Sequence, residues 1–156
     1  TALEYQPRFP LAYNNMGSVK MLLGDYQGAI EDYTQALMLD PELAIALNNR
    51  GYARYYMENV DGALQDFDAA ISLNDSLPVA TLNKASLMAR QNNLDVALQL
   101  LDAMVEAYPD EALLYLNRGL IRELTGDING ACDDWHKVKE LGSGEADAYI
   151  KECDEL

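Results

Sequence analysis

A stretch of ten residues that begins at Gly24 returns along the chain at a fixed interval, and this repetition constrains the fold more than any other feature. Related stretches begin at Glu58, Asn92 and Gly126, each 34 residues after the one before, without insertion or deletion. A fixed period of roughly 20–50 residues is typical of repeat proteins, in which one supersecondary unit is stacked several times. We therefore expect an array of similar units.

Each copy has the features of two helices joined by a short turn. An Asp or Asn at the second position of every copy is a candidate N-cap, because its side-chain oxygen can accept a hydrogen bond from the first helical turn. These caps are Asp25, Asn59, Asn93 and Asp127. Apolar residues at helical spacing follow the cap, and another helical segment precedes it, for example over residues 11–23 and 44–57.

A small residue stands in the middle of each first helix, and an alanine stands early in each second helix. The first set is Gly17, Gly51, Ala85 and Gly119, and the second set is Ala29, Ala63, Ala97 and Ala131. We expect the two sets to face each other, since a larger side chain would overpack a close contact between paired helices.

Together these positions resemble the tetratricopeptide repeat, a helix–turn–helix unit of the same period. The matching residues of the first copy are Gly17, Tyr26, Ala29, Tyr33, Ala36 and Pro41. The resemblance implies an all-α protein folded as a right-handed α-solenoid. The third copy departs most, with Val96 in place of glycine and Leu101 in place of an aromatic residue, but both side chains stay apolar. The last copy is similar to the final repeat of bacterial members of the family.

The period divides the chain into four expected repeats and a C-terminal helix. The repeats cover residues 10–43, 44–77, 78–111 and 112–145, and residues 146–156 form an amphipathic helix of the kind that caps an array. Residues 1–9 are similar to the tail of a second helix, which suggests a fragment of a longer array. The alternative is an N-terminal tail that caps the array.

The charge of the chain disfavours two classes of partner. It has 11 Lys and Arg against 26 Asp and Glu, a formal charge of −15. Such a chain is poorly suited to bind nucleic acid or an anionic membrane surface, and it has no apolar run that could insert into a membrane. We interpret the acids of the second helices as a solvated outer face, with an acidic docking surface as the alternative. These acids are Glu31, Asp32, Asp66, Asp68, Asp102, Asp133 and Asp134. No signal peptide is visible, but this says little for a chain that we expect to be a fragment. We favour the cytoplasm, and an exported or periplasmic protein stays open.

A ladder of asparagines marks the expected binding groove. First helices line the concave side of stacked helix pairs, and each carries an asparagine at the same position: Asn15, Asn49, Asn83 and Asn117. Because Asn offers both a donor and an acceptor, such a ladder can pair with the backbone of an extended peptide, as similar ladders do in some tetratricopeptide proteins. The alternative is that these amides bond to the neighbouring helix.

Other groove positions suggest side-chain anchors. The candidates are Asn48, Tyr52, Tyr56 and Arg90. Tyr52 and Tyr56 are one helical turn apart, so their rings share a face, and Tyr is enriched at binding hot spots. Packing of these rings between helices is the alternative.

Signals for chemistry are weak. No nucleophile stands beside a base at a recognisable spacing, so we expect neither an enzyme nor a cofactor site. Cys132, His136 and Cys153 match no recognised zinc pattern. We expect the two cysteines to be small buried apolar residues; a disulfide between them is the alternative.

The sequence therefore predicts a non-enzymatic protein–protein interaction module that binds a peptide or protein segment in the groove. One alternative is an architectural spacer that associates end to end through the apolar edge of the helix over residues 11–23. Another is a regulatory segment of a larger enzyme. The identity of the partner is beyond the reach of groove chemistry.

Overall fold

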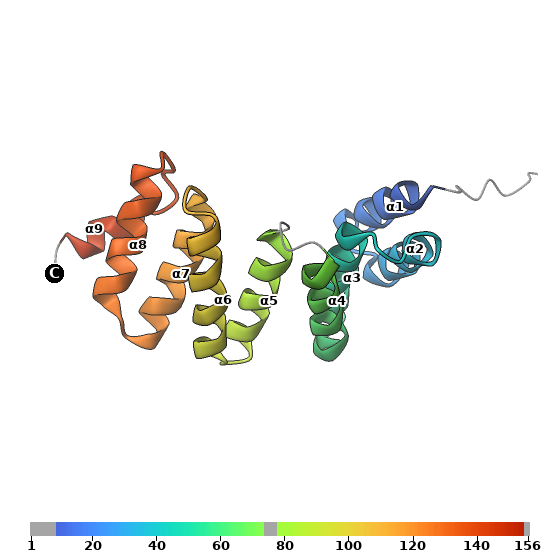
Figure 1. The fold of residues 1–156 in the computed structure, drawn as a ribbon, viewed down its shortest axis with the longest axis horizontal. Helices are drawn as coiled ribbons and strands as arrows, with labels where there is room; N and C mark the ends of the chain where they lie inside the picture. The colour runs from blue at the N-terminus through green and yellow to red at the C-terminus, as the bar shows by residue number, and fades with distance from the viewer. Residues whose placement is uncertain (1–8, 74–77, 155–156) are drawn as a thin grey trace, which may run out of the picture. The chain divides into compact units, whose positions relative to one another are not determined.

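A computed structural model describes residues 9–73 and 78–154, and these residues form nine α-helices and no strand (Figure 1). The helices are α1 (Pro10–Leu22), α2 (Tyr26–Leu39), α3 (Ala44–Tyr56), α4 (Val60–Leu73), α5 (Pro78–Arg90), α6 (Leu94–Ala107), α7 (Ala112–Thr125), α8 (Ile128–Glu140) and α9 (Asp147–Cys153). The first helices of the successive pairs are α1, α3, α5 and α7, and each begins 34 residues after the one before. The predicted all-α class is confirmed. The tail expected over the first residues lies, except for residue 9, outside the described residues.

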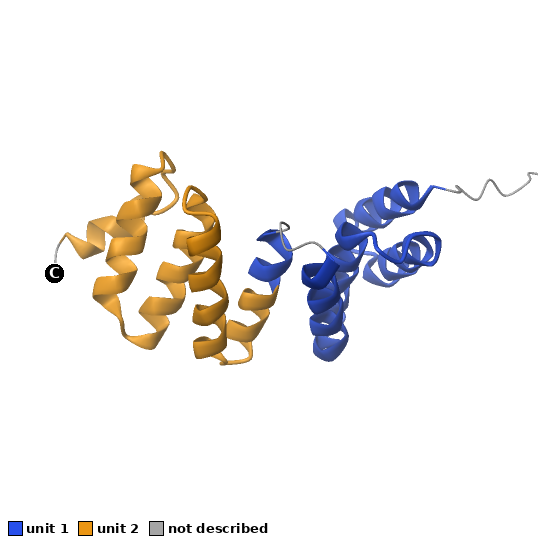
Figure 2. Ribbon diagram, in the orientation of Figure 1, with its two compact units in different colours: residues 1–83 blue, residues 84–156 orange. Residues whose placement is uncertain are grey.

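The chain forms two compact units, residues 1–83 and residues 84–156 (Figure 2). In unit 1, α1 packs on α2, α3 packs on α4, and α2 also contacts α3. In unit 2, α6 packs on α7, α7 on α8, and α8 on α9. Each unit is thus a series of helices in which sequence neighbours are neighbours in space.

The helix pairs close around aromatic rings that lie over glycines. In unit 1, a Cβ added to Gly17 would fall 2.7 Å from the ring of Tyr33, and one added to Gly51 would fall 2.8 Å from the ring of Phe67. In unit 2 the same relationship joins Gly119 to Trp135, at 2.5 Å. The predicted close contact is present, but its main partner is the aromatic ring; a backbone atom of the facing alanine comes next only at Gly51, where the carbonyl oxygen of Ala63 would lie 3.1 Å away. The four alanines of the second helices are all fully buried.

The turns between paired helices repeat one backbone geometry. Gly24, Glu58, Asn92 and Gly126 all have positive φ, between 61° and 85°. This left-handed conformation ends a helix, and a residue with a Cβ adopts it at a cost. The repeated stretch therefore starts with a helix stop and continues with the N-cap of the next helix.

Three of the four predicted N-cap hydrogen bonds are present. The side chains of Asp25, Asn59 and Asp127 each accept a hydrogen bond at 3.0 Å from the backbone N–H three residues later, which belongs to a glycine. A Cβ on those glycines would collide with the cap side chain. Asn93 makes no such bond, because the residue three positions later is Val96, whose Cβ occupies that space. Asn93 therefore stands at the predicted N-cap position of α6 but lacks the predicted hydrogen bond.

Three acids assigned to a solvated outer face are buried instead. Asp32, Asp66 and Asp134 are 7%, 3% and 2% exposed. Asp66 receives two bonds from Arg50, at 3.0 and 2.8 Å, and a third ionic contact from Arg54 at 2.8 Å. The same arrangement recurs in Arg118, Arg122 and Asp134. Burial of Asp66 and Asp134 is tolerated because arginine side chains satisfy their oxygens, whereas Asp32 is paired with the ammonium of Lys20 at 2.7 Å.

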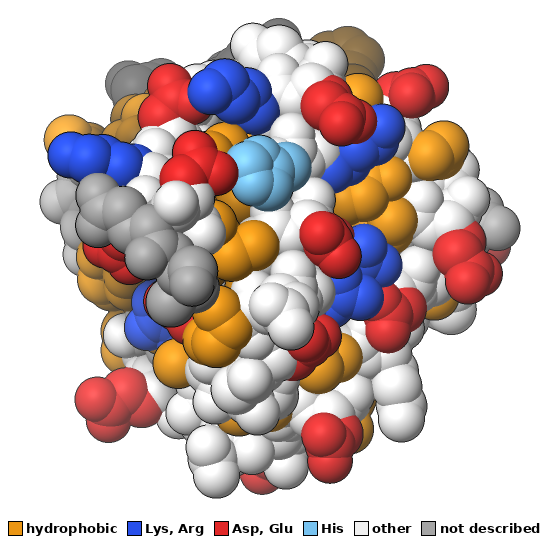
Figure 3. All heavy atoms as spheres, turned by 90° about the vertical axis from the view of Figure 1, so that its left-hand side faces the viewer, with side chains coloured by type: hydrophobic (Ala, Val, Ile, Leu, Met, Phe, Trp, Pro, Cys, Tyr) orange, Lys and Arg blue, Asp and Glu red, His pale blue; other side chains and the backbone are white. Residues whose placement is uncertain are grey.

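The C-terminal helix α9 is attached to α8 by a disulfide between Cys132 and Cys153, whose Cα atoms are 5.8 Å apart. The expectation of free cysteines was therefore wrong, because the turn after α8 brings α9 back beside the start of α8. Trp135 stacks on Tyr149 at 4.8 Å between ring centroids, and Ile150 is buried. Acidic and basic side chains lie among hydrophobic ones on the face shown in Figure 3, at the α8 and α9 side of Figure 1. Among the described helices, none has the length and apolar character needed to cross a bilayer.

Candidate functional site

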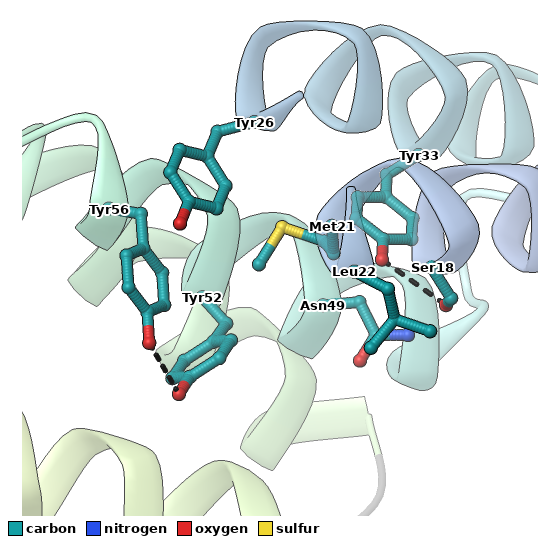
Figure 4. Close-up of a pocket in the computed structure, with 8 residues that line it drawn as sticks. All are labelled: Ser18, Met21, Leu22, Tyr26, Tyr33, Asn49, Tyr52 and Tyr56. Atoms are coloured by element: carbon teal, nitrogen blue, oxygen red, sulfur yellow. Dashed lines mark hydrogen bonds between the residues drawn. The ribbon is translucent and has the colours of Figure 1, made fainter. Parts of the chain in front are cut away.

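A pocket of about 430 Å³ opens in unit 1 between the first two helix pairs. Its lining comes from three helices: Ser18, Met21 and Leu22 of α1, Tyr26 and Tyr33 of α2, and Asn49, Tyr52 and Tyr56 of α3. Figure 4 shows Tyr26, Tyr52 and Tyr56 on one side, Ser18 and Tyr33 on the other, and Met21, Leu22 and Asn49 between them. The volume falls within the roughly 300–1,000 Å³ that is usual for ligand pockets.

The tyrosines of one wall form a tight cluster. Tyr26 stacks on Tyr56 with ring centroids 4.8 Å apart, and Tyr52 meets Tyr56 edge to face at 5.1 Å. The hydroxyls of Tyr52 and Tyr56 are hydrogen-bonded at 3.2 Å. Both rings nevertheless stay 41% and 45% exposed. The cluster is therefore held in place by its own contacts while it presents aromatic surface to solvent.

The opposite wall is built around the hydroxyl of Tyr33. That oxygen lies 3.2 Å from Oγ of Ser18, which itself donates to the carbonyl of Asn14. Burial of the phenol raises the pKa of Tyr33, an effect that the bond to Ser18 partly offsets. This wall stays neutral at physiological pH. Because Ser18 donates its hydrogen to Asn14, Tyr33 donates to Ser18, and the two hydroxyl oxygens offer lone pairs as acceptors to the pocket.

The asparagines of the first three first helices are linked to one another. Nδ2 of Asn83 donates to Oδ1 of Asn48 at 2.9 Å, and Nδ2 of Asn49 donates to Oδ1 of Asn14 at 3.0 Å. Longer contacts of 3.4 and 3.5 Å run from Asn48 to Asn49 and from Asn14 to Asn15. One chain of amides, donating in a single direction, thus crosses from α5 through α3 to α1.

The structure brings some of the predicted site residues together and leaves others apart. Asn49, Tyr52 and Tyr56 line the pocket. Asn83, Asn48 and Asn15 belong to the chain of amides. Asn83 is its first donor, Asn48 is buried within it, and Asn15 is its exposed last acceptor. Asn117 of unit 2 donates to the carbonyl of Leu113 at 2.7 Å, and Arg90 is exposed at the end of α5. Contact of any of these residues with a peptide stays a prediction.

Ser18 and Met21 stand at positions that the repeat pattern places in the groove, but three other pocket residues were not expected to line the site. Leu22 was seen only as part of an apolar helix, and Tyr26 and Tyr33 only as positions of the repeat pattern. A signal was available for Tyr26, since it is the first residue of a second helix and so lies beside the end of the following first helix. That placement brings it against Tyr56.

A second feature of unit 1 is an exposed apolar face on α1 and the turn after it. Leu11, Val19, Leu22 and Leu23 are 58%, 56%, 89% and 77% exposed. The first three residues lie on one side of the helix by their spacing. Exposed apolar side chains gathered on one face of a helix are typical of interaction sites.

No group of three or more potential metal ligands occurs among residues 9–73 and 78–154. The sulfurs of Cys132 and Cys153 are bonded to each other and are not thiolate ligands.

Models of one family match most of this chain. A tetratricopeptide repeat model covers residues 10–43, and a second tetratricopeptide repeat model covers residues 48–112 and 82–135. No curated protein has a sequence that matches this chain.

Several solved structures share the fold at low sequence identity. A crystal structure of MamA is 22% identical, with a TM-score of 0.77, and covers 89% of this chain and 81% of its own. Pseudomonas aeruginosa PilF is 19% identical, with a TM-score of 0.78 and coverages of 85% and 61%. A chain of the APC/C hetero-tetramer Cut9–Hcn1 is 14% identical, with a TM-score of 0.79; the match covers 89% of this chain and 26% of that chain. The helices are therefore arranged as in solved helical repeat proteins.

Proposed function

Because the chain belongs to the tetratricopeptide repeat family, whose repeats are modules of protein–protein interaction, we propose that it binds a peptide or protein segment along the first helices of unit 1. The bound segment inserts a side chain into the tyrosine pocket, and its backbone lies along the asparagines.

The observation that carries this proposal is the pocket itself. It combines exposed rings, Tyr52 and Tyr56, with a polar amide at Asn49. Rigid aromatic residues give large contact area at a low cost in conformational entropy, and their mutual contacts lower that cost further. A preorganised site of this kind loses less conformational entropy on binding than a site that its ligand must first order.

Asn49 retains hydrogen-bonding capacity for a ligand. A carboxamide has two N–H donors and a carbonyl with two lone pairs. In Asn49, one N–H donates to Asn14, and the oxygen accepts from Asn48. One donor and one lone pair remain, which matches the pair of groups that a peptide unit presents.

The test is a pull-down from an extract of the source cells, followed by a binding isotherm with the purified partner. The variant Tyr52→Ala/Tyr56→Ala removes the exposed wall of the pocket. The control Met38→Ala/Leu73→Ala removes two exposed apolar side chains from second helices of the same unit. We expect the partner to be retained by the control and lost by the tyrosine variant, with helicity unchanged. A partner retained equally by both variants would contradict binding in this pocket.

The exposed face of α1 favours a second candidate, association of the chain with another copy through this face. Leu22 and Leu23 are the most exposed large apolar residues of α1 and its turn. Sedimentation at increasing concentration tests the idea. A mass that rises with concentration, and that Leu11→Asp or Val19→Asp holds at the monomer value, supports association; a monomer at every concentration excludes it.

A further inference from the structure

The tyrosine pocket is uncharged but lies in an acidic unit. Its lining residues in the described part of unit 1 carry no ionisable group other than phenols. The described residues of this unit, 9–73 and 78–83, include nine Asp and Glu but only three Lys and Arg. Lys20, Arg50 and Arg54 each bind a buried carboxylate, at 2.7 to 2.8 Å. The basic groups of the unit are thus engaged in the fold, and the acids set the sign of its field.

The lining groups suit a cation that carries many donors. Four phenol oxygens, the hydroxyl of Ser18 and the carbonyl of Asn49 are acceptors. The faces of the tyrosine rings attract a cation through their quadrupole. A guanidinium satisfies both features, because it is planar, carries five N–H donors and stacks on aromatic rings. An ammonium is more strongly hydrated, so it loses more hydration free energy than a guanidinium when it enters the pocket.

From this complementarity we infer that the pocket receives the guanidinium of an arginine from a basic segment of the partner. The inference rests on the proposed function, since it names the chemistry of the side chain that enters the same pocket. Aromatic-lined grooves also bind proline-rich segments. A proline ring is neutral, however, and would gain no electrostatic attraction from the acidic residues of the unit. The charge balance therefore favours arginine.

The inference is tested on the whole chain with two small probes, N-acetyl-arginine N-methylamide and its citrulline counterpart. Citrulline has nearly the same shape but no charge. Binding is followed by NMR of ¹³C-labelled tyrosine rings. We expect the dissociation constant of the arginine probe to be about fivefold lower than that of the citrulline probe, as a cation–π contact predicts.

Three variants locate the effect. Tyr52→Phe keeps the ring and should retain the preference, whereas Tyr52→Leu/Tyr56→Leu should abolish it. Met38→Ala/Leu73→Ala should leave it unchanged. A preference for arginine that arose only from the overall negative charge would persist in the leucine variant, because its acidic residues are intact. That outcome would overturn the inference. If the leucine variant loses helicity, Tyr52→Leu and the citrulline comparison on the unmodified chain decide the question.

The two proposals fail in different ways. Equal binding of arginine, citrulline and a matching N-acetyl-proline probe in the pocket would overturn the inference and leave groove binding in place. The same holds if the proline probe binds best. If no probe shifts these rings and the cellular partner binds independently of Tyr52 and Tyr56, both proposals are wrong.

Discussion

The ring of Phe67 lies so close to Gly51 that an added Cβ would fall 2.8 Å from Cε1 of that ring and 3.1 Å from the carbonyl oxygen of Ala63. The glycine is therefore part of the seat of the ring. In the third repeat the corresponding residues are Ala85 and Leu101. There the larger alanine in place of glycine is accompanied by a smaller leucine in place of phenylalanine.

We predict that Gly51→Ala lowers the free energy of unfolding by about 1–3 kcal/mol, as overpacking of a core contact does. Phe67→Leu should also be destabilising, because it leaves a void. The double variant recreates the pair of the third repeat and should cost less than the sum of the single changes. Urea unfolding followed by circular dichroism measures all three; strict additivity would contradict the proposed fit between the two residues.

The N-caps should differ in strength although their sequences are alike. Asn59→Ala removes a bond to the N–H of Gly62 and should cost about 1 kcal/mol. Asn93→Ala removes no cap bond and should change the free energy of unfolding by no more than a few tenths of a kcal/mol. The same unfolding experiment compares them, and an equal loss in both variants would show that Asn93 caps α6 in solution.

Glu58 is held in a left-handed conformation with φ of 61°. Glycine adopts this conformation readily, whereas an L residue with a Cβ loses about 1–2 kcal/mol. We therefore expect Glu58→Gly to raise the free energy of unfolding by about 0.5–1 kcal/mol after the greater entropy of glycine in the unfolded chain is counted. The reverse change, Gly126→Ala, should be destabilising. A melting temperature that falls in the first variant would argue against this turn geometry.

Stability should decline in strongly alkaline solution. Burial raises the pKa of Tyr33 above 10.0, and the hydrogen bond to Asp32 raises the pKa of Lys20 above 10.5. Both groups hold their proton more tightly in the folded chain. Their contribution is therefore complete below the unfolded pKa, near pH 10, and is lost as pH rises through the higher folded values.

The measurement is the melting temperature between about pH 7 and pH 11.5, a range that spans the unfolded pKa values. Tyr33→Phe removes the phenol and should make the alkaline decline shallower, because only the contribution of Lys20 remains. An identical decline in the variant would mean that Tyr33 titrates alike in the folded and unfolded chain.

Periodicity was enough to predict the helix pairs, because caps, turns and apolar stripes recur at one interval and require only local backbone preferences. It was not enough for side chains whose partners lie on another helix. The ladder was predicted from a spacing of 34 residues, yet Asn49 bonds to Asn14 and Asn83 bonds to Asn48, a spacing of 35. Asparagines stand side by side at positions 14 and 15 and at 48 and 49, and the sequence does not show which member of each pair meets the neighbouring helix.

Charge illustrates a second limit. A count of acids treats Asp66 and Asp68 alike, but Asp66 faces Arg50 and Arg54 and is buried. The recurrence of two arginines four residues apart, followed by an aspartate 16 residues after the first, could have revealed these pairs. The pocket could not be predicted from such a pattern, because its walls come from α1, α2 and α3 and depend on how these helices pack.

The link between Cys132 and Cys153 changes how the end of the chain can open. A helix of seven residues, the length of α9, is too short to persist alone in water. Short helices with few packing partners usually open easily, and their amide hydrogens exchange quickly with solvent. Here the last residue of α9 is tied to the first turns of α8, so the short helix remains near its seat after each local opening. Amide protection in α9 should then follow that of α8 and drop to the level of a frayed end when the bond is reduced.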